Sequence, residues 1–81
     1  MTSVAAVETG RVLRELREAS GLSAAAVSRR LGMSAGLVAT YERGDRTLSV
    51  GRLCDLADLY GMDPGLVLDL IQLRCGTSPV R

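Results

Sequence analysis

The segment from residue 21 to residue 44, GLSAAAVSRRLGMSAGLVATYERG, constrains the fold of this 81-residue chain more than any other part of it. Its spacing predicts two short helices joined by a turn at Gly32. Ser23 and Ser34 each stand just before a run with helical spacing, where a serine hydroxyl can cap free backbone N–H groups. Gly44 follows the second run, and a glycine there ends a helix because it adopts positive φ.

The apolar residues of the two predicted helices share one face of each helix. Two short helices, a turn of three to four residues that contains glycine, and apolar faces turned to one core are typical of a DNA-binding helix-turn-helix. The pattern therefore predicts a helix-turn-helix core over residues 23–43. The apolar positions are Val27 and Leu31 in the first helix and Leu37, Val38 and Tyr41 in the second.

Four segments in a fixed order connect this core to a known family. They are LRELREASGLS (13–23), RRLGMS (29–34), YERGDR (41–46) and LCDLADLYGMDPGLVLDL (53–70). Together they resemble the XRE/Cro repressor family of bacterial and phage regulators over roughly residues 11–71. The stretch YERGDRTLSVGRLCDLADLYGM is most similar to the actinobacterial developmental repressors of that family. The resemblance implies an all-α, five-helix, lambda-repressor-like DNA-binding domain.

Composition agrees with an all-α chain and limits its core. Hydrophobic residues make up 47% of the sequence, but Phe and Trp are absent and only Tyr41 and Tyr60 are aromatic. The core must therefore be built from Leu, Val, Ala and Met, which recur at helical spacing without strand-like alternation. A chain of this size buries only about 60% of its unfolded surface, so a dimer would help its stability.

The charges are distributed unevenly along the chain. Residues 1–52 carry eight arginines and five acidic residues, whereas residues 53–81 carry two arginines and four aspartates. The half that contains the helix-turn-helix is therefore basic and the rear half acidic. This polarity would orient the chain on a polyanion; ordinary surface variation is the alternative interpretation.

The segment before the core predicts an amphipathic helix that ends at Ser20-Gly21. It begins either after Ser3 or after Thr9, and the longer version contains Gly10, which costs about 1 kcal/mol relative to alanine. Charged residues on its outer face can pair at helical spacing. The predicted inner face carries Val12, Leu13, Leu16 and Ala19, and the predicted pairs join Glu15 and Glu18 to Arg11 and Arg14.

Two further helices are predicted after the core. One begins at the cap Ser49 and closes at Gly61; the next begins at Asp63-Pro64, a cap followed by proline at the first helical position, and runs to about Arg74. Residues 76–81 are predicted as a flexible tail, so the domain covers residues 1–75. The fourth helix is predicted to turn Val50, Leu53, Cys54, Leu56, Ala57 and Tyr60 inward. Cys54 is interpreted as a small core residue, and a disulfide with Cys75 is not expected in a reducing compartment.

The fifth helix is apolar over an arc of about 220°, whereas about 100° suffices to face one core. The part that does not pack on the fourth helix would be exposed in a monomer. We therefore predict a two-fold dimer interface that includes Leu66, Leu70 and Leu73. Alternatively, the first helix or a second domain covers this surface.

The resemblance places the helix after Ser34 in the major groove, with the exposed residues near its start at base edges. It offers no Arg, Lys, Asn or Gln there for bidentate base contacts. Specificity would then rest on thymine methyl groups, DNA shape and nearby arginines. The predicted DNA-contacting residues are Ser23, Ser34, Ala35, Gly36, Leu37, Ala39, Thr40, Arg43, Arg46 and Thr47.

The resemblance also aligns Arg17 and Glu42 with an ion pair that related repressors bury beneath the recognition helix. Loss of one partner of a buried pair leaves the other uncompensated. Glu42 is therefore predicted to orient the helix and not to contact DNA.

Catalysis and cofactor binding are not expected, because the chain has no His or Lys, no paired acids in an obvious cleft, and no cysteine spacing typical of metal or redox sites. No apolar run approaches the ~20 residues of a membrane span, and no signal peptide opens the chain. We predict a cytoplasmic, nucleoid-associated transcriptional regulator, in the first place a repressor, with double-stranded DNA and a second copy as partners. The alternative is a protein-interaction module of the same fold, antitoxin-like or a polymerase-associated adaptor.

Overall fold

The computed structural model describes residues 4–34 and 36–76, and in these ranges the chain forms five helices and no strand. The predicted all-α, five-helix fold is confirmed. The helices are α1 (Val4–Ala19), α2 (Ala24–Arg30), α3 (Leu37–Arg43), α4 (Val50–Leu59) and α5 (Pro64–Arg74).

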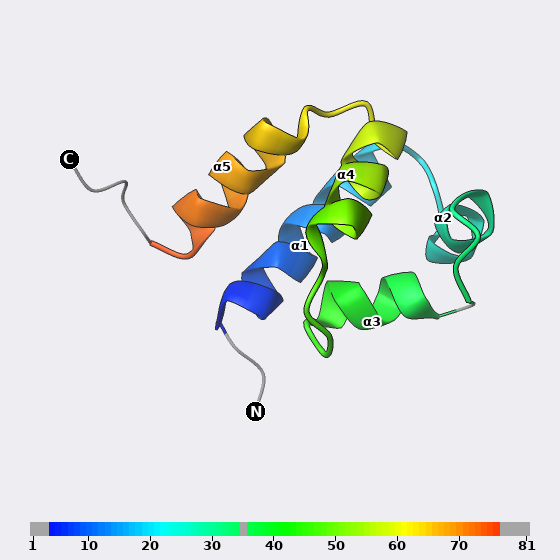
Figure 1. Cartoon of the computed structure of the whole chain (residues 1–81), viewed down its shortest axis with the longest axis horizontal. Coiled ribbons are helices and arrows are strands. Elements are labelled where there is room, and N and C mark those ends of the chain that lie inside the picture. Colours follow the sequence, from blue (N-terminus) through cyan, green and yellow to red (C-terminus); the bar gives the residue numbers. More distant parts are fainter. Residues whose placement is uncertain (1–3, 35, 77–81) are drawn as a thin grey trace.

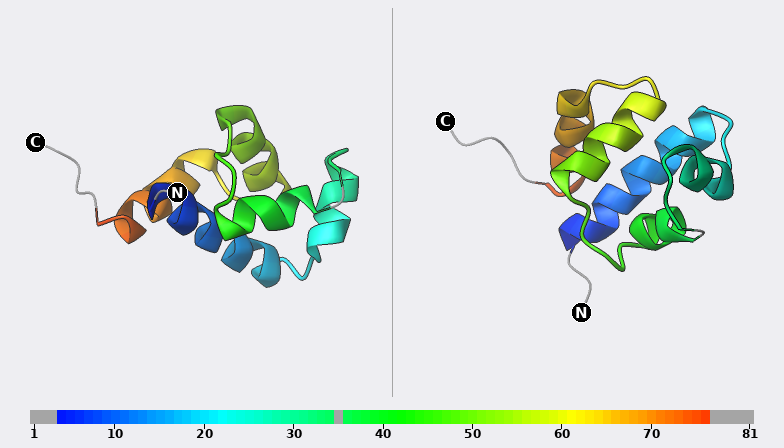
Figure 2. Two further views of the ribbon diagram at one scale, coloured as in Figure 1. Left: turned by 90° about the horizontal axis from the view of Figure 1, so that it is seen from below. Right: turned by 45° about the vertical axis from the view of Figure 1, so that its right-hand side comes forward.

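Helix α1 is the centre of the bundle. Helices α2 and α3 lie on one side of it and α5 on the other (Figures 1 and 2). Helix α1 packs against α3 and α5, α2 packs against α3, and α4 packs against α5. One hydrophobic core, aliphatic except for one tyrosine, joins these contacts; its buried residues are Val12, Leu13, Val27, Met33, Val38, Tyr41, Leu53, Leu56, Ala57, Val67 and Ile71.

Local side-chain caps start three of the five helices. Ser23, Ser49 and Asp63 each accept a hydrogen bond from the backbone N–H three residues further on. Pro64 follows Asp63 at the first helical position, where a missing N–H costs nothing. These three predicted starts are confirmed, because each depends only on residues adjacent in sequence.

Helix α1 takes the longer of its two predicted forms. It begins at Val4, and Ser3 lies outside the described residues. Thr9 is not a cap: its hydroxyl donates to the Ala5 carbonyl within the helix at 2.6 Å. Gly10 is buried where α1 crosses α3, and a Cβ there would lie 2.2 Å from the Glu42 carbonyl oxygen. Glycine is therefore required at this position of α1, because any side chain would collide with the α3 backbone.

A second glycine completes this crossing from the side of α3. Gly44 ends α3 with φ +81°, and a Cβ there would lie 2.9 Å from the Val7 Cα. The backbones of α1 and the end of α3 are thus in direct contact. This contact fixes how α3 lies on the bundle.

Three positions predicted to face inward are exposed, and these predictions are wrong. Cys54 lies on the outer surface of α4, about 100° round the helix from Leu53. Val50 is 76% exposed because it stands at the first residue of α4, beyond the end of the core. Ala19 is exposed at the last residue of α1. Cys54 and Cys75 are both free thiols.

The outer charges of α1 pair only partly as predicted. Arg14 and Glu18 form the expected pair one turn apart, at 3.2 Å. Glu15 instead pairs with Arg74 at the end of α5. That contact joins α1 to α5 across the bundle, which helical spacing alone could not indicate.

Helix α5 buries one face and leaves the other uncovered. Val67 and Ile71 point into the core, so α1 and α4 cover that edge. Leu66, Leu70 and Leu73 on the outer face are 54%, 38% and 75% exposed. Neighbouring helices therefore do not cover the wide apolar arc.

Candidate nucleic-acid interface

The turn between α2 and α3 depends on a glycine with positive φ and on a backbone hydrogen bond that spans five residues. Gly32 has φ +66°, and the Met33 N–H donates to the Ser28 carbonyl at 2.8 Å. Met33 then enters the core, so the turn is anchored by its own side chain.

Helix α3 begins two residues later than predicted. Its N-terminal cap is Gly36, with φ +87° and no side-chain hydrogen bond, so the prediction that Ser34 caps this helix is wrong. The Ser34 carbonyl instead accepts from the Leu37 N–H at 3.2 Å. The left-handed turn at Gly36 interrupts the helical path, and that conformation favours glycine.

Helix α3 lies with one face in the core and the other at the surface. Val38 and Tyr41 are buried, whereas Arg43 is exposed. Among the predicted contact residues, the exposed ones are Ser23, Ser34, Gly36, Arg43, Arg46 and Thr47; the half-buried ones are Leu37, Ala39 and Thr40; Ala35 lies outside the described residues. Helix α3 and the loop that follows it lie along one edge of the bundle, at the lower right of Figure 1.

Two of the predicted DNA-contacting residues already form side-chain hydrogen bonds within the chain. The Thr40 hydroxyl donates to the Gly36 carbonyl at 2.9 Å. Arg43 donates through Nε to the Asp45 carboxylate at 2.9 Å. The sequence prediction did not include Asp45 in the site, although an acid two residues after an arginine at a helix end was a visible signal.

The Arg17–Glu42 pair supports α3 from beneath. Arg17 Nε and Nη2 donate to the two Glu42 carboxylate oxygens at 2.7 and 3.1 Å, and Arg17 Nη1 donates to the Leu22 carbonyl at 2.9 Å. The two side chains are only 14% and 8% exposed. The hydrogen bond to Glu42 raises the pKa of Arg17, against the effect of burial. Glu42 thus faces away from any ligand on the outer side of α3.

Tyr60 lies beside this ion pair at the end of α4. Its hydroxyl is buried and has no hydrogen-bond partner among the described residues. Burial, with a smaller contribution from the Glu42 charge, raises the pKa of Tyr60 to about 12. Ionisation of Tyr60 is therefore disfavoured in the folded chain.

Replacement of Tyr60 by phenylalanine is expected to leave stability at pH 7 nearly unchanged, because no bond is lost. At high pH the two chains should differ. The unfolded phenol ionises near 10 and the folded one near 12, so wild-type stability falls as pH rises between these values. Urea denaturation at pH 9 and 11.5 checks this expectation. An equal loss of stability in Tyr60→Phe would contradict it.

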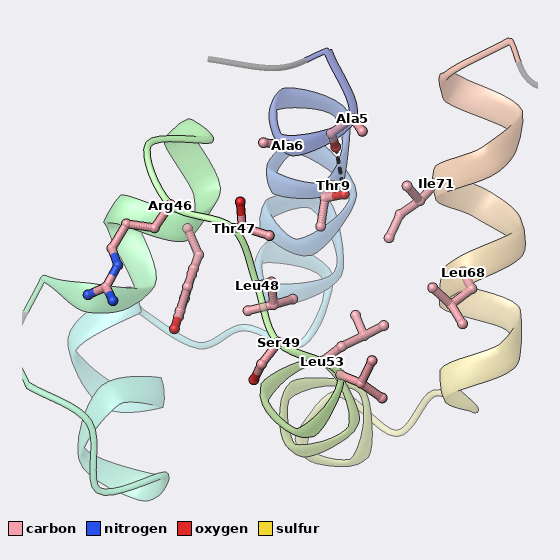
Figure 3. A pocket seen from close by; sticks show the side chains of 12 residues that line it. Ala5, Ala6, Thr9, Arg46, Thr47, Leu48, Ser49, Leu53, Leu68 and Ile71 are labelled. Carbon is pink, nitrogen blue, oxygen red and sulfur yellow. Dashed lines mark hydrogen bonds between the residues drawn. The ribbon is translucent and has the colours of Figure 1, made fainter. Parts of the chain in front are cut away.

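A hollow of about 230 Å³ lies behind the loop that follows α3, between α1, α4 and α5. Leu53, Leu68 and Ile71 face it, while the Arg46 side chain extends away from Leu68 and Ile71 (Figure 3). The Thr9 hydroxyl at its wall is bonded within α1. Among the described residues that line this hollow, Arg46 is the only charged one and its side chain turns away, so we assign the hollow no ligand.

Two general properties of the described residues limit the classes of site. No helix among residues 4–34 and 36–76 has the length and apolar character needed to cross a membrane. The same residues contain no group of three or more His, Cys, Asp or Glu side chains placed to hold a metal ion.

These features define a helix-turn-helix domain: a short α2, a glycine turn, and an α3 held on α1 with its outer face open. The chain matches the family model described as "Helix-turn-helix domain" over residues 8–70, and it belongs to that family. The helix-turn-helix family predicted from the sequence motifs is thereby confirmed. None of the curated proteins compared with the chain matches it.

Two solved structures are similar to this chain over most of its length. The first is described as the structure of the S. venezulae BldD DNA-binding domain; it is 39% identical, with a TM-score of 0.71, and the match covers 80% of this chain and 97% of that one. The second is a crystal structure of the DNA-binding domain of BldD, also 39% identical with a TM-score of 0.71. That match covers 83% of this chain and 97% of the BldD chain. These matches agree with the fold predicted from the sequence.

Proposed function

We propose that this chain is a non-enzymatic transcriptional regulator that binds double-stranded DNA sequence-specifically, acting as a repressor and as a dimer. It needs no cofactor and acts on the nucleoid in the cytoplasm. The observation that carries the proposal is the open outer face of α3, set on a helix-turn-helix that is 39% identical to a domain described as DNA-binding.

The positions of the charged groups support backbone binding. Arg46 and Thr47 are exposed in the loop after α3, and Arg46 has no acidic partner within salt-bridge distance in the described part of the chain. Ser23 is exposed at the start of α2. Groups of this kind position a protein on phosphates, while the α3 face meets base edges. The predicted contacts that would make up this face are Ser34, Gly36, Leu37, Ala39 and Thr40, while Ala35 lies outside the described residues.

A competition binding assay with random duplexes tests the proposal. A sequence-specific regulator selects a pseudo-palindrome at moderate salt, with half-sites about 10 bp apart or at a multiple of that spacing. Retention that is salt-sensitive but selects no sequence would overturn it in favour of an interaction module. One observation favours this second candidate: the described residues at the start of the α3 face, 36–40, carry no side chain capable of a bidentate base contact.

Replacement of Arg46 by alanine is expected to weaken binding to all duplexes alike, because a phosphate contact carries no sequence information. The slope of log Kobs against log salt should become shallower by about one unit. Titrations at four salt concentrations measure this slope. A slope identical to that of wild type would remove Arg46 from the interface.

The uncovered leucines of α5 support a two-fold dimer. A stripe formed by Leu66, Leu70 and Leu73 is available for a second copy because the chain's own helices do not cover it. Leu66→Glu/Leu73→Glu should convert the dimer to a monomer with little change in the fold, since both residues are exposed. Analytical ultracentrifugation at micromolar concentration checks this, with wild type measured in parallel. A monomeric wild-type chain would defeat the dimer proposal.

A further inference from the structure

The exposed end of α3 carries an internal arginine–carboxylate pair where a DNA ligand would lie. Arg43 Nε donates to Asp45 Oδ2 at 2.9 Å, and Arg43 Nη2 lies 3.5 Å from the Thr40 hydroxyl. Arg43 and Thr40 are both among the predicted DNA-contacting residues. The pair is open to solvent, with side chains that are 62% and 50% exposed.

The backbone holds Asp45 at this position. The Asp45 N–H donates to the Thr40 carbonyl at 3.1 Å, and the Gly44 N–H donates to the Tyr41 carbonyl at 3.0 Å. This is the bonding pattern of a glycine-terminated helix, in which the two residues after the helix satisfy its last carbonyls. Gly44 in turn lies against α1 at Val7. The Asp45 carboxylate is therefore attached to a fixed point beside Arg43.

Arg46, in the loop after α3, differs from Arg43 in its charge pairing. Arg46 has no acidic partner within salt-bridge distance among the described residues, whereas the charge of Arg43 is offset by Asp45. An approaching phosphate would meet a free guanidinium at Arg46 and a guanidinium already neutralised at Arg43. It would also meet the negative charge of Asp45 itself, and like charges brought together at an interface oppose binding.

We propose that Asp45 is a brake on DNA binding: it competes with backbone phosphate for Arg43 and so lowers affinity for every duplex. This inference rests on the proposed DNA-binding function and assigns Asp45 as a positioning residue that acts through Arg43. Because phosphates are the same in all sequences, a weaker backbone grip leaves a larger share of discrimination to the α3 face. That matters because the described residues at the start of this face, 36–40, carry no side chain capable of a bidentate base contact.

The test measures duplex affinity and its salt dependence for wild type, Asp45→Asn, Arg43→Ala and the double variant. Asp45→Asn keeps the shape and removes the charge, so it should bind duplexes about tenfold more tightly with a salt slope steeper by about one unit. Arg43→Ala should weaken binding only slightly in wild type and strongly in the Asp45→Asn background. Glu18→Gln is the matched control: it makes the same change of net charge by breaking an exposed pair with Arg14 on α1.

Each outcome decides something different. Equal affinity and slope in Asp45→Asn and wild type would overturn the brake while leaving DNA binding intact. An equal gain in Glu18→Gln would also overturn it, since only net charge would then matter. A wild-type chain and an Asp45→Asn variant that both fail to bind duplex would instead reject the proposed function. Thermal melts of all variants verify that the fold is retained, as expected for an exposed pair.

Discussion

Replacement of Gly10 by alanine is expected to destabilise the fold by about 3 kcal/mol, although alanine is the better helix former. The added Cβ would lie 2.2 Å from the Glu42 carbonyl oxygen and 2.6 Å from the Tyr41 carbonyl oxygen. Backbone atoms cannot turn aside as a side chain can, so α1 and α3 would have to separate. In a domain of this size the midpoint of thermal unfolding should fall by roughly 12–24 °C.

Gly51 provides the matched control. It also lies in a helix, but a Cβ there would meet nothing closer than the Ser49 hydroxyl at 4.0 Å. Gly51→Ala should therefore stabilise the chain by about 0.5–1 kcal/mol through the entropy of the unfolded state. Urea denaturation of both variants measures whether each change in the free energy of unfolding is a loss, as expected for Gly10→Ala, or a gain, as expected for Gly51→Ala. A Gly10→Ala variant as stable as wild type would mean that α1 and α3 do not cross this closely.

Replacement of Glu42 by alanine is expected to cost about 3 kcal/mol, because it leaves the part-buried Arg17 guanidinium without its counter-charge. Arg17 would keep only its bond to the Leu22 carbonyl. The loss should appear as a lower urea midpoint, and duplex binding should weaken in proportion to the unfolded fraction.

The double variant Arg17→Met/Glu42→Leu separates a structural role from a contact role. Apolar residues of similar size can replace a buried pair with little loss, so much of the stability should return. If Glu42 only orients α3, duplex affinity should return with it. Recovery of the fold without recovery of binding would show that the ion pair does more than position the helix.

Local rules succeeded wherever the deciding atoms are neighbours in sequence. The caps at Ser23, Ser49 and Asp63 and the stop at Gly44 follow from hydrogen bonds within three or four residues. Periodicity likewise identified Val12, Leu13, Val27 and Val38 as core residues, since a helix repeats its inner face every turn.

Local rules failed where a contact comes from elsewhere in the chain, where a helix turns a residue outward, or where a helix begins later than its pattern predicts. Cys54 was predicted to be buried because its neighbours are apolar, yet α4 turns it outward. Ser34 was predicted to cap α3, but the positive φ of Gly36 delays the helix. The pairing of Glu15 with Arg74 and the state of Arg43 depend on side chains that the pattern does not bring together.

The sequence by itself determined the five helices, the starts of α2, α4 and α5, the helix-turn-helix order and the resemblance to a regulator family. Each of these depends on short-range spacing or on motifs that stand in a fixed order. Only the tertiary structure decided that Gly10 is a contact point and not a weakness, that Arg17 and Glu42 meet at 2.7 Å, and that Asp45 holds Arg43. The physical reason is that close approach and charge pairing are properties of distances in space, which residue spacing along the chain does not specify.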